Sequence, residues 1–394
     1  MPIRKHSLSQ PLVWLILIIG IVFLFYITMD FVAQPDWLII DDYVEYWAAG
    51  RLNITGGNPY QPKELLPLQH PACRFMGVPV MMYNPPWTMV LVMPFGAIDY
   101  QVGRAIWLLA TILVVIICSD IAWRLFGGLE SKRIFGWLIG LSFVPILDGL
   151  RAGQISTLSY LGVVFFLYYL HRKNDWLAGV SLALLAVKPH TMLLFMIAFF
   201  FWMIKNRRWI IFISFIATLT AATLIACAFN PSVIQQYLHA LTHYPPNEWA
   251  TPTIGSILRA IFGLEIFWLQ YIPTIIGIVW FGFYWSRNHL SWNWHEQAPL
   301  ITLVSIVTSA YGWIFDLSPI LIAIILIAIR IFSSPITKIG WIAVISYLSI
   351  NIVDFILRVP QFWLWWLAPI LLVWYLTFNR LISATEIQDG FGLT

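Results

Sequence analysis

Charged residues are scarce in this 394-residue sequence. Asp, Glu, Lys and Arg make up only 10% of it, whereas 60% is hydrophobic and the mean hydropathy is +0.81. Soluble domains carry about 25% charged residues. The low charge content excludes an ordinary soluble domain and predicts an integral membrane protein. The net charge of +4 is spread thinly between apolar segments, so it does not indicate a nucleic-acid partner.

Residues suited to metal or redox chemistry are also few. The three cysteines, Cys73, Cys118 and Cys227, have no metal-binding or redox spacing. The chain has no glycine-rich loop for nucleotide phosphates, no zinc-ligand spacing and no Ser–His–Asp order. The sequence therefore predicts no cofactor and does not require a metal, but it leaves a bound metal open.

Long apolar segments dominate what is present. A membrane-spanning helix needs about 20 mostly apolar residues, and such segments recur from residue 11 to residue 378. We therefore expect an all-α polytopic membrane protein with a bundle of roughly 11–13 transmembrane helices. Residues 1–380 would form one membrane domain, and residues 381–394 a short, poorly structured cytoplasmic tail. The expected helices are 11–29, 102–124, 133–149, 155–171, 176–188, 190–204, 209–229, 266–285, 298–311, 315–333, 337–357 and 362–378.

Two stretches depart from a simple spanning pattern. Residues 84–98 are apolar but contain three prolines, which shorten and bend a helix, so we expect this piece not to cross the membrane. Residues 176–188 and 190–204 are each short for a full span. They meet at Lys188-Pro189-His190, which predicts a broken or re-entrant helix pair.

The distribution of basic residues predicts the orientation. With the N-terminus in the cytoplasm and 84–98 not spanning, most of the 22 Lys and Arg residues fall in short cytoplasmic turns. The first apolar segment lacks a small-x-small cleavage site, so we expect it to be retained as the first helix. The membrane is expected to be a bacterial inner membrane. Polar residues distant in sequence would then converge at one extracytoplasmic mouth. The segments expected there are the loop 31–101, with interfacial helices, and residues 149–154, 230–265 and 311–316.

Three carboxylates stand in the first polar stretch, which reads Asp41-Asp42-Tyr43-Val44-Glu45-Tyr46-Trp47. A carboxylate in a membrane-facing cleft can act as general base toward an attacking hydroxyl. In a helix that starts at Asp42, Glu45 and Tyr46 would share its face. The same spacing also suits a helix N-cap at Asp42 with Glu45 in the first turn. The local sequence leaves both interpretations open.

Three basic residues are candidate ligands for the phosphate of a lipid donor. Arg151 lies between two expected helices, and Lys188 and His190 flank a proline in an apolar run. An ionisable residue within the membrane is costly and marks a functional candidate, and an anion such as a phosphate is its natural partner. Alternatively, Lys188 snorkels, or pairs structurally with Asp148 or Asp316. Asp316 itself could bind a sugar hydroxyl or cap its helix.

Six short motifs follow one another along the chain: Asp42-Tyr43-x-x-Tyr46-Trp47-Ala48-Ala49, Gly57-Asn58-Pro59-Tyr60, Tyr83-Asn84-Pro85-Pro86, Gly153-Gln154, Lys188-Pro189-His190, and Ser309-x-Tyr311 with Asp316. This ordered set resembles glycosyltransferase family 87, the polyprenyl-phosphate-mannose-dependent mannosyltransferase-like group of the GT-C membrane glycosyltransferases. The resemblance implies inverting transfer of a mannosyl or other hexosyl group from a polyprenyl-phosphate donor to a hydroxyl of a glycolipid or glycan, among membrane lipids.

The resemblance also suggests roles for residues. Asp42 would be the general base, with Asp41 as the alternative, and Lys188 and His190 would lie near the donor phosphate. Arg151 joins them because of its charge and its expected place on the same face. The candidate substrate-binding residues are Glu45, Tyr46, Tyr60, Asn84, Gln154 and Asp316.

Two other functions fit parts of the pattern. A transporter or flippase for a lipid-linked substrate could use the same Lys188, but its site would need discontinuous helices in both halves of the chain, and only one clear break is visible. A structural subunit of an envelope-assembly complex would tolerate Asp42→Ala without loss of function.

Overall fold

The computed structural model describes residues 25, 28–29, 42–72, 77–246, 249–333, 335–357 and 360–391, with side chains as far as residue 383. Within these ranges the chain is helical and has no β-strand. This confirms the expected all-α class. The expected helix 11–29 lies almost entirely outside the described residues, and Asp41 lies outside them.

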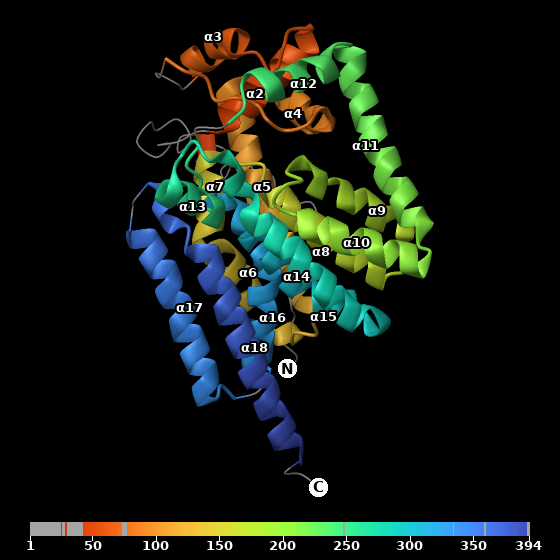
Figure 1. The fold of residues 1–394 in the computed structure, drawn as a ribbon, viewed down its shortest axis with the longest axis vertical. Helices are drawn as coiled ribbons and strands as arrows, with labels where there is room; N and C mark the ends of the chain where they lie inside the picture. The colour runs from red at the N-terminus through yellow and green to blue at the C-terminus, as the bar shows by residue number, and fades with distance from the viewer. Residues whose placement is uncertain are drawn as a thin grey trace, which may run out of the picture.

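The helices gather into one bundle. Figure 1 shows α2, α3, α4 and α12 together at one end of the molecule, and α17 and α18 extending toward the other. The elements are α2 (Tyr43–Thr55), α3 (Pro62–Ala72), η2 (Pro86–Thr88), α4 (Met89–Gly96), α5 (Tyr100–Leu125), η3 (Glu130–Lys132), α6 (Arg133–Ser142), α7 (Val144–Ala152), α8 (Thr157–His171), α9 (Asp175–Ala183), η4 (Leu185–Val187), α10 (Leu193–Asn206), α11 (Trp209–Phe229), α12 (Val233–His243), α13 (Ile254–Phe262), η5 (Phe267–Tyr271), α14 (Ile272–Asn288), η6 (His289–Ser291), α15 (Trp294–Val307), η7 (Ile314–Ile320), α16 (Leu321–Phe332), α17 (Lys338–Ile356), η8 (Gln361–Leu364) and α18 (Leu367–Phe391).

Several of these helices are long and apolar enough to cross a membrane. Six qualify in the described part of the chain, or seven if the bent pair α6–α7 counts as one span, and four further apolar helices are shorter. The expected 11–13 spans included three of those shorter helices, Thr157–His171, Asp175–Val187 and Leu193–Asn206, which cannot each cover a hydrocarbon core of about 30 Å alone. The six are Tyr100–Leu125, Trp209–Phe229, Phe267–Ser291, Ile314–Phe332, Lys338–Ile356 and Gln361–Ser383.

The helix expected over 133–149 is in fact broken. Its two halves, α6 and α7, meet at an angle of 56°, and Phe143 between them has an extended backbone. Pro145 causes the break, because a proline lacks the N–H that would continue α6 and its ring clashes with the carbonyl four residues earlier. The bend places the end of α7 against the first turn of α2, where Asp42 N donates to Ala152 O at 2.7 Å.

The expected break at Lys188 is confirmed. The 3₁₀ turn η4 ends at Val187 and α10 begins only at Leu193, while Lys188 itself has φ −132° and ψ 71°. Residues 84–98 form only η2 and the eight-residue α4. A helix of that length is about 12 Å long, too short to cross the membrane.

Two parts of the chain are more helical than expected. The segment 230–265 contains α12 and α13. The tail expected at 381–394 is helical as far as Phe391, because α18 continues into it. No proline or glycine interrupts residues 370–389, so nothing in that stretch stops a helix.

The buried apolar side chains of the described residues form two clusters. The larger cluster is built mainly on α5, α8, α10, α15 and α16, and it includes Leu150 and Ala186. The smaller cluster lies around α2 and α4 and includes Ile155 and Val187. The side chains that flank Gln154 and those that precede Lys188 are thus divided between the two clusters, which places these polar residues at the boundary between them.

Candidate active site

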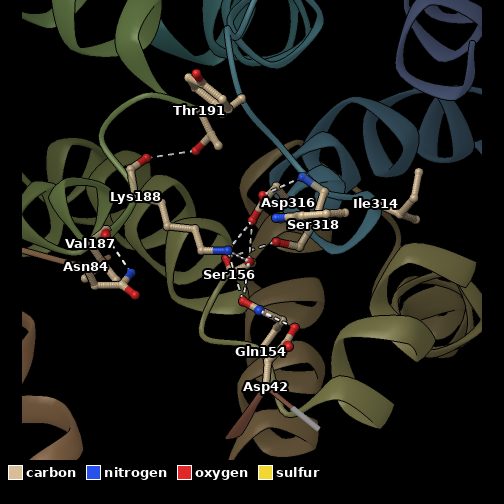
Figure 2. Close-up of polar contacts among 12 residues, drawn as sticks. Asp42, Asn84, Gln154, Ser156, Val187, Lys188, Thr191, Ile314, Asp316 and Ser318 are labelled. Carbon is tan, nitrogen blue, oxygen red and sulfur yellow. Dashed lines mark hydrogen bonds and ion pairs between the residues drawn. The ribbon is translucent and has the colours of Figure 1, made fainter. Parts of the chain in front are cut away.

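Gln154 is the centre of a polar cluster drawn from four distant parts of the chain. Its Oε1 accepts hydrogen bonds from Lys188 Nζ and from Tyr46 OH, both at 2.9 Å, and its Nε2 donates to Asp42 Oδ2 at 2.7 Å. Figure 2 shows Asp42, Gln154, Lys188 and Asp316 facing one another. The expected convergence of distant polar residues is therefore confirmed for this set.

The C-terminus of α7 sets the position of Gln154. Gly153 adopts the left-handed conformation with φ +69°, and Gln154 N bonds back to Gly149 O at 2.9 Å, as in glycine-capped helix ends. A Cβ on Gly153 would lie 2.5 Å from Tyr43 Cβ. The fully buried Arg104 donates from Nη2 to the carbonyls of Leu150 and Arg151, at 2.9 and 2.8 Å. Glycine and this arginine thus allow the tight approach of α7 to α2.

The ammonium group of Lys188 donates all its hydrogen bonds to acceptors inside the protein. Its Nζ lies 2.9 Å from Gln154 Oε1, 2.9 Å from Ser156 Oγ and 2.8 Å from Asp316 Oδ1. These contacts match the three N–H donors of an ammonium group. Only 11% of the Lys188 side chain and 3% of the Asp316 side chain are exposed. Of the two structural partners considered from the sequence, Asp148 and Asp316, the structure shows Asp316.

Asp316 uses both carboxylate oxygens. Oδ1 accepts from Lys188 and from Ser156 Oγ, and Oδ2 accepts from Trp313 N at 2.8 Å. The last contact caps η7, one of the two roles that the sequence left open. Ser156 was not a predicted site residue, yet it bridges the cation and the carboxylate. The sequence feature that could have indicated Ser156 as a site residue is its position two residues after Gln154.

The first polar loop caps the break before Lys188. Asn84 Nδ2 donates to Val187 O and Trp87 Nε1 donates to Ala186 O, both at 2.9 Å. These carbonyls end a helical segment and have no partner within it. Tyr60 OH in turn donates to Asn84 O at 3.0 Å. Asn84 and Tyr60, predicted as substrate-binding residues, are buried and support the loop that holds Lys188.

The carboxylates of the cluster differ in exposure. Asp42 is half-buried, whereas Glu45 and Asp316 are 8% and 4% exposed. Asp42 occupies the N-cap position of α2 but makes no side-chain capping hydrogen bond. Its carboxylate turns instead to the neutral amide of Gln154, which orients the group without cancelling its charge.

The ammonium group of Lys188 can only donate, so it orients Oε1 of the Gln154 amide toward itself, and the phenol of Tyr46 fits the same orientation. Burial raises the pKa of Tyr46 well above its ordinary value, and the charges of Glu45 and Asp42 add to this effect. The phenol is therefore neutral and donates its proton to Gln154 Oε1. The amide nitrogen must then be the atom that faces Asp42.

Two predicted phosphate ligands are not hydrogen-bonded into the cluster by their side chains in the described structure. Arg151 points toward Asp148, with 3.9 Å between Nη1 and Oδ1, and 40% of its side chain is exposed. His190 is exposed, and its backbone carbonyl accepts from Ser309 Oγ at 3.2 Å. Arg104 is a buried cation that the sequence reasoning missed. A charged residue within the apolar run of α5 was the available signal.

The space beside Asp316 is small. A cavity of about 20 Å³ lies between Thr191, Thr253, Tyr311 and Asp316, close to the volume that one water molecule needs. Among the described residues no three His, Cys, Asp or Glu side chains are grouped so that they could hold a metal ion. The groups available for chemistry here are the half-buried carboxylate of Asp42 and the ammonium group of Lys188, which are both hydrogen-bonded to the side-chain amide of Gln154.

In a comparison with sequence models of protein families, the one for glycosyltransferase family 87 matches residues 83–314, which is more than half of the chain. This protein belongs to glycosyltransferase family 87. It is therefore a multi-pass membrane glycosyltransferase, as the resemblance implied. No curated protein and no solved structure matches the chain significantly.

The matched stretch divides the candidate residues of this family member. It includes Gln154 and Lys188, which form the middle of the cluster. It begins after Asp42 and ends before Asp316. The family match thus supports the activity class, while the roles of the two acids rest on the geometry of this chain.

Proposed function

We propose that this glycosyltransferase moves a hexose, in the first instance mannose, from a polyprenyl-phosphate donor to an acceptor hydroxyl on the extracytoplasmic face, with inversion at the anomeric carbon. Asp42 is the general base. The acceptor is a glycolipid or glycan, and the protein is a multi-pass component of a bacterial inner membrane. The observation that carries the proposal is the contact between Gln154 and Asp42, because it couples the most exposed acid of the cluster to the buried Lys188.

Asp42 supports the role of base in two ways. It is half-buried, so an acceptor can reach it. In contrast, both carboxylate oxygens of Asp316 already accept hydrogen bonds, from Lys188, Ser156 and Trp313. A positioned carboxylate that takes a proton in the transition state contributes typically 10²–10⁴-fold to the rate. The Gln154 amide holds one oxygen of Asp42, which leaves the carboxylate oriented for the acceptor hydroxyl.

The reaction then needs one proton transfer and one displacement. Asp42 takes the proton of the acceptor hydroxyl, the hydroxyl oxygen attacks the anomeric carbon, and the bond from that carbon to the phosphate oxygen breaks. The polyprenyl phosphate leaves with the bonding electrons as a phosphate monoester, so no strong acid is required. Attack from the face opposite the phosphate inverts the configuration, and a β-linked donor yields an α-linked product.

Cations favour the departing phosphate by electrostatic stabilisation. Arg151 is accessible and is the proposed cationic ligand, and the exposed His190 is proposed to donate a hydrogen bond to the phosphate as a neutral imidazole, since desolvation lowers its pKa to about 4. Lys188 already donates to three internal acceptors, so it acts through its charge and by holding Gln154. Glu45 and Tyr46 are buried beside Asp42 in the first turn of α2, and they are proposed to orient the base and Gln154 toward the substrates.

The membrane orientation expected from the basic turns supports an extracytoplasmic position for the candidate site. Two lysines of the basic turns contact other turns that we also expect on the cytoplasmic side: Lys132 Nζ donates to Phe332 O at 2.6 Å, and Lys205 Nζ donates to His289 O. Such turns belong on the cytoplasmic side. The transporter alternative is not favoured by a specific contact in this structure, and membership of a glycosyltransferase family counts against it.

The test is transfer from labelled polyprenyl-phosphate mannose to a membrane-lipid extract by the purified protein in lipid. Asp42→Asn is expected to lower transfer about 10²–10⁴-fold while donor binding is kept. Asp99→Asn is the matched control, because Asp99 caps α5 through Gln101 N and Val102 N and asparagine caps equally well.

Other results would change the proposal in defined ways. Full activity of Asp42→Asn together with loss in Asp41→Asn would move the base by one residue. Full activity of both variants would refute a carboxylate base in this loop. Binding of other lipid-phosphate hexoses, but not of the mannose donor, would reject mannose.

A further inference from the structure

A second, much larger recess lies beside the candidate active site. It has a volume of about 660 Å³ and is bounded by α13, η5, η8 and the chain at Trp249. Its walls are mainly apolar, with Trp249, Ala260, Phe267 and Phe362 among them. We call this recess the α13 groove.

The α13 groove opens onto a surface suited to lipid. Ile261 and Phe262 at the end of α13 are 67% and 64% exposed, and Leu264 and Trp268 beside them are 63% and 65% exposed. Contiguous exposed apolar residues of this size mark a membrane-facing or interaction surface. In a membrane protein, a hydrocarbon chain can therefore enter the groove sideways without crossing water.

The inner end of the groove lies close to the polar cluster. The Trp249 ring lies 5.8 Å from the Trp313 ring, and Trp313 N donates to Asp316. Ser256, in the groove wall, accepts from Thr253 Oγ1 at 3.1 Å, and Thr253 lines the small cavity beside Asp316. One layer of side chains thus separates the groove from the Lys188–Asp316 ion pair.

The cation in the groove wall is engaged within the protein. Arg259 is 6% exposed and donates from Nε to Leu264 O at 3.0 Å and from Nη1 to Gln270 Oε1 at 3.3 Å. Its guanidinium carbon also lies 5.0 Å from the centre of the Phe267 ring. A phosphate or sugar would have to break these contacts, whereas an apolar chain would not. Apart from the exposed carboxylate of Glu265, the groove wall is therefore complementary to hydrocarbon.

We propose that the α13 groove holds the isoprenoid chain of the lipid donor, so that the donor's phosphate and sugar extend from it to the cluster around Gln154 and Lys188. This rests on the proposed function, because it assumes a lipid-phosphate donor. The groove then determines which chain lengths the enzyme accepts. The residues that matter are Trp249, Ala260, Phe267 and Phe362, none of which belongs to the cluster.

The first experiment fills the groove and compares two donors with the same sugar phosphate. Ala260 is exposed at the end of α13, so Ala260→Trp adds bulk to the groove without disturbing a core. We expect the KM for a long polyprenyl-phosphate hexose to rise by at least about tenfold, the effect of uncovering roughly two methylene groups. The KM for a citronellyl-phosphate hexose, whose chain is too short to fill the groove, should be unchanged.

Ala217→Trp is the matched control, since Ala217 is an exposed alanine of the membrane-spanning α11 away from the groove. It should leave both KM values unchanged. An equal effect of Ala260→Trp on both donors, or no effect on the long one, would overturn the proposal.

A second measurement does not depend on transfer. A polyprenyl phosphate with a photoreactive group in its chain is crosslinked to the wild-type protein, and the labelled peptides are identified by mass spectrometry. Labelling of α13, η5 or η8 that excess polyprenyl phosphate suppresses would support the groove even if the hexose or acceptor were assigned wrongly. Suppressible labelling confined to other helices would refute it, while leaving the proposed transfer reaction intact.

Discussion

Gln154 donates a hydrogen bond of 2.7 Å to Asp42 although the two residues are 112 positions apart. The same amide accepts from Lys188 and Tyr46. A single neutral side chain therefore sets the orientation of the proposed base and links it to the buried cation. This arrangement leads to direct tests of the cluster.

The first prediction concerns the amide of Gln154. Gln154→Glu keeps the shape and the contact with Lys188, but it replaces the donor that faces Asp42 with a second carboxylate. A like charge disfavours the ionised base, so the acidic limb of the pH–rate profile should move to higher pH. Loss of one hydrogen bond to a charged group should lower kcat/KM about 10–100-fold near neutral pH. An unshifted profile would show that Gln154 does not act through Asp42.

The second prediction concerns the buried ion pair. Lys188→Met leaves Asp316 as an uncompensated buried charge and should cost about 3–5 kcal/mol in the free energy of unfolding. Adding Asp316→Asn should restore most of this, because a neutral amide can still accept from Trp313 N. Denaturant unfolding in mixed micelles measures both variants.

The control for that cycle is Arg208→Met. Arg208 pairs with Asp175 at a more exposed site, where 34% and 18% of the two side chains are exposed. Such a pair contributes about 1 kcal/mol or less. Equal losses from Lys188→Met and Arg208→Met would contradict the view that burial makes the Lys188–Asp316 pair special.

The third prediction compares two glycines with the same backbone conformation. Gly153 and Gly56 have φ of +69° and +76°. A Cβ on Gly153 would lie 2.5 Å from Tyr43 Cβ, whereas a Cβ on Gly56 would meet nothing within 4 Å. Gly56→Ala should cost only the backbone term of about 1–2 kcal/mol. Gly153→Ala should cost more and should also lower transfer, since it displaces Gln154.

Thermal unfolding and transfer assays on the two glycine variants separate these effects. Equal destabilisation with unchanged activity in both would mean that the contact between α7 and α2 yields easily. It would then not be the constraint that places Gln154.

The fourth prediction concerns stability at alkaline pH. Burial raises the pKa values of Tyr46 and Tyr60 well above the ordinary value of 10.0. Above pH 10 the unfolded chain ionises these phenols while the folded protein keeps them protonated, so the unfolded state is favoured. The free energy of unfolding should therefore be insensitive to these groups below pH 10 and fall above it, by about 1.4 kcal/mol per pH unit for each group.

Tyr46→Phe tests this assignment. It should reduce the slope of stability against pH above pH 10 by the contribution of one group, and it should cost about 0.5–1.5 kcal/mol at neutral pH through the lost hydrogen bond to Gln154. A slope equal to that of the wild type would mean that Tyr46 titrates normally in the folded protein.

Several features could be predicted because they depend on local sequence. The expected helix 209–229 has the bounds of α11. A long apolar segment in a membrane must satisfy its own backbone hydrogen bonds, and a helix does this along its whole length. The break at Lys188 followed from a proline inside an apolar run. The break at Phe143 also had a local signal in Pro145, but the apolar pattern runs through it and concealed the bend.

The candidate site was predictable in part. Asp42, Tyr46, Gln154, Lys188 and Asp316 were all predicted, and they meet. Their partners could not be predicted, because a hydrogen bond depends on which side chains lie within about 3 Å and in the correct orientation. Ser156 is an example, since a serine after a helix end has many ordinary roles. Tyr60 and Asn84 show the opposite case, as buried residues that hold the loop.

The sequence by itself determined that this protein is a helical membrane protein of glycosyltransferase family 87, because hydropathy and ordered motifs are properties of the chain. The tertiary structure alone decided that Lys188 is paired with Asp316 and that Gln154 joins them to Asp42. The sequence allowed Asp148 and Asp316 equally as partners of Lys188. The choice between them follows from the bend between α6 and α7 and from the way the helices pack, which bring only Asp316 within reach of the ammonium group.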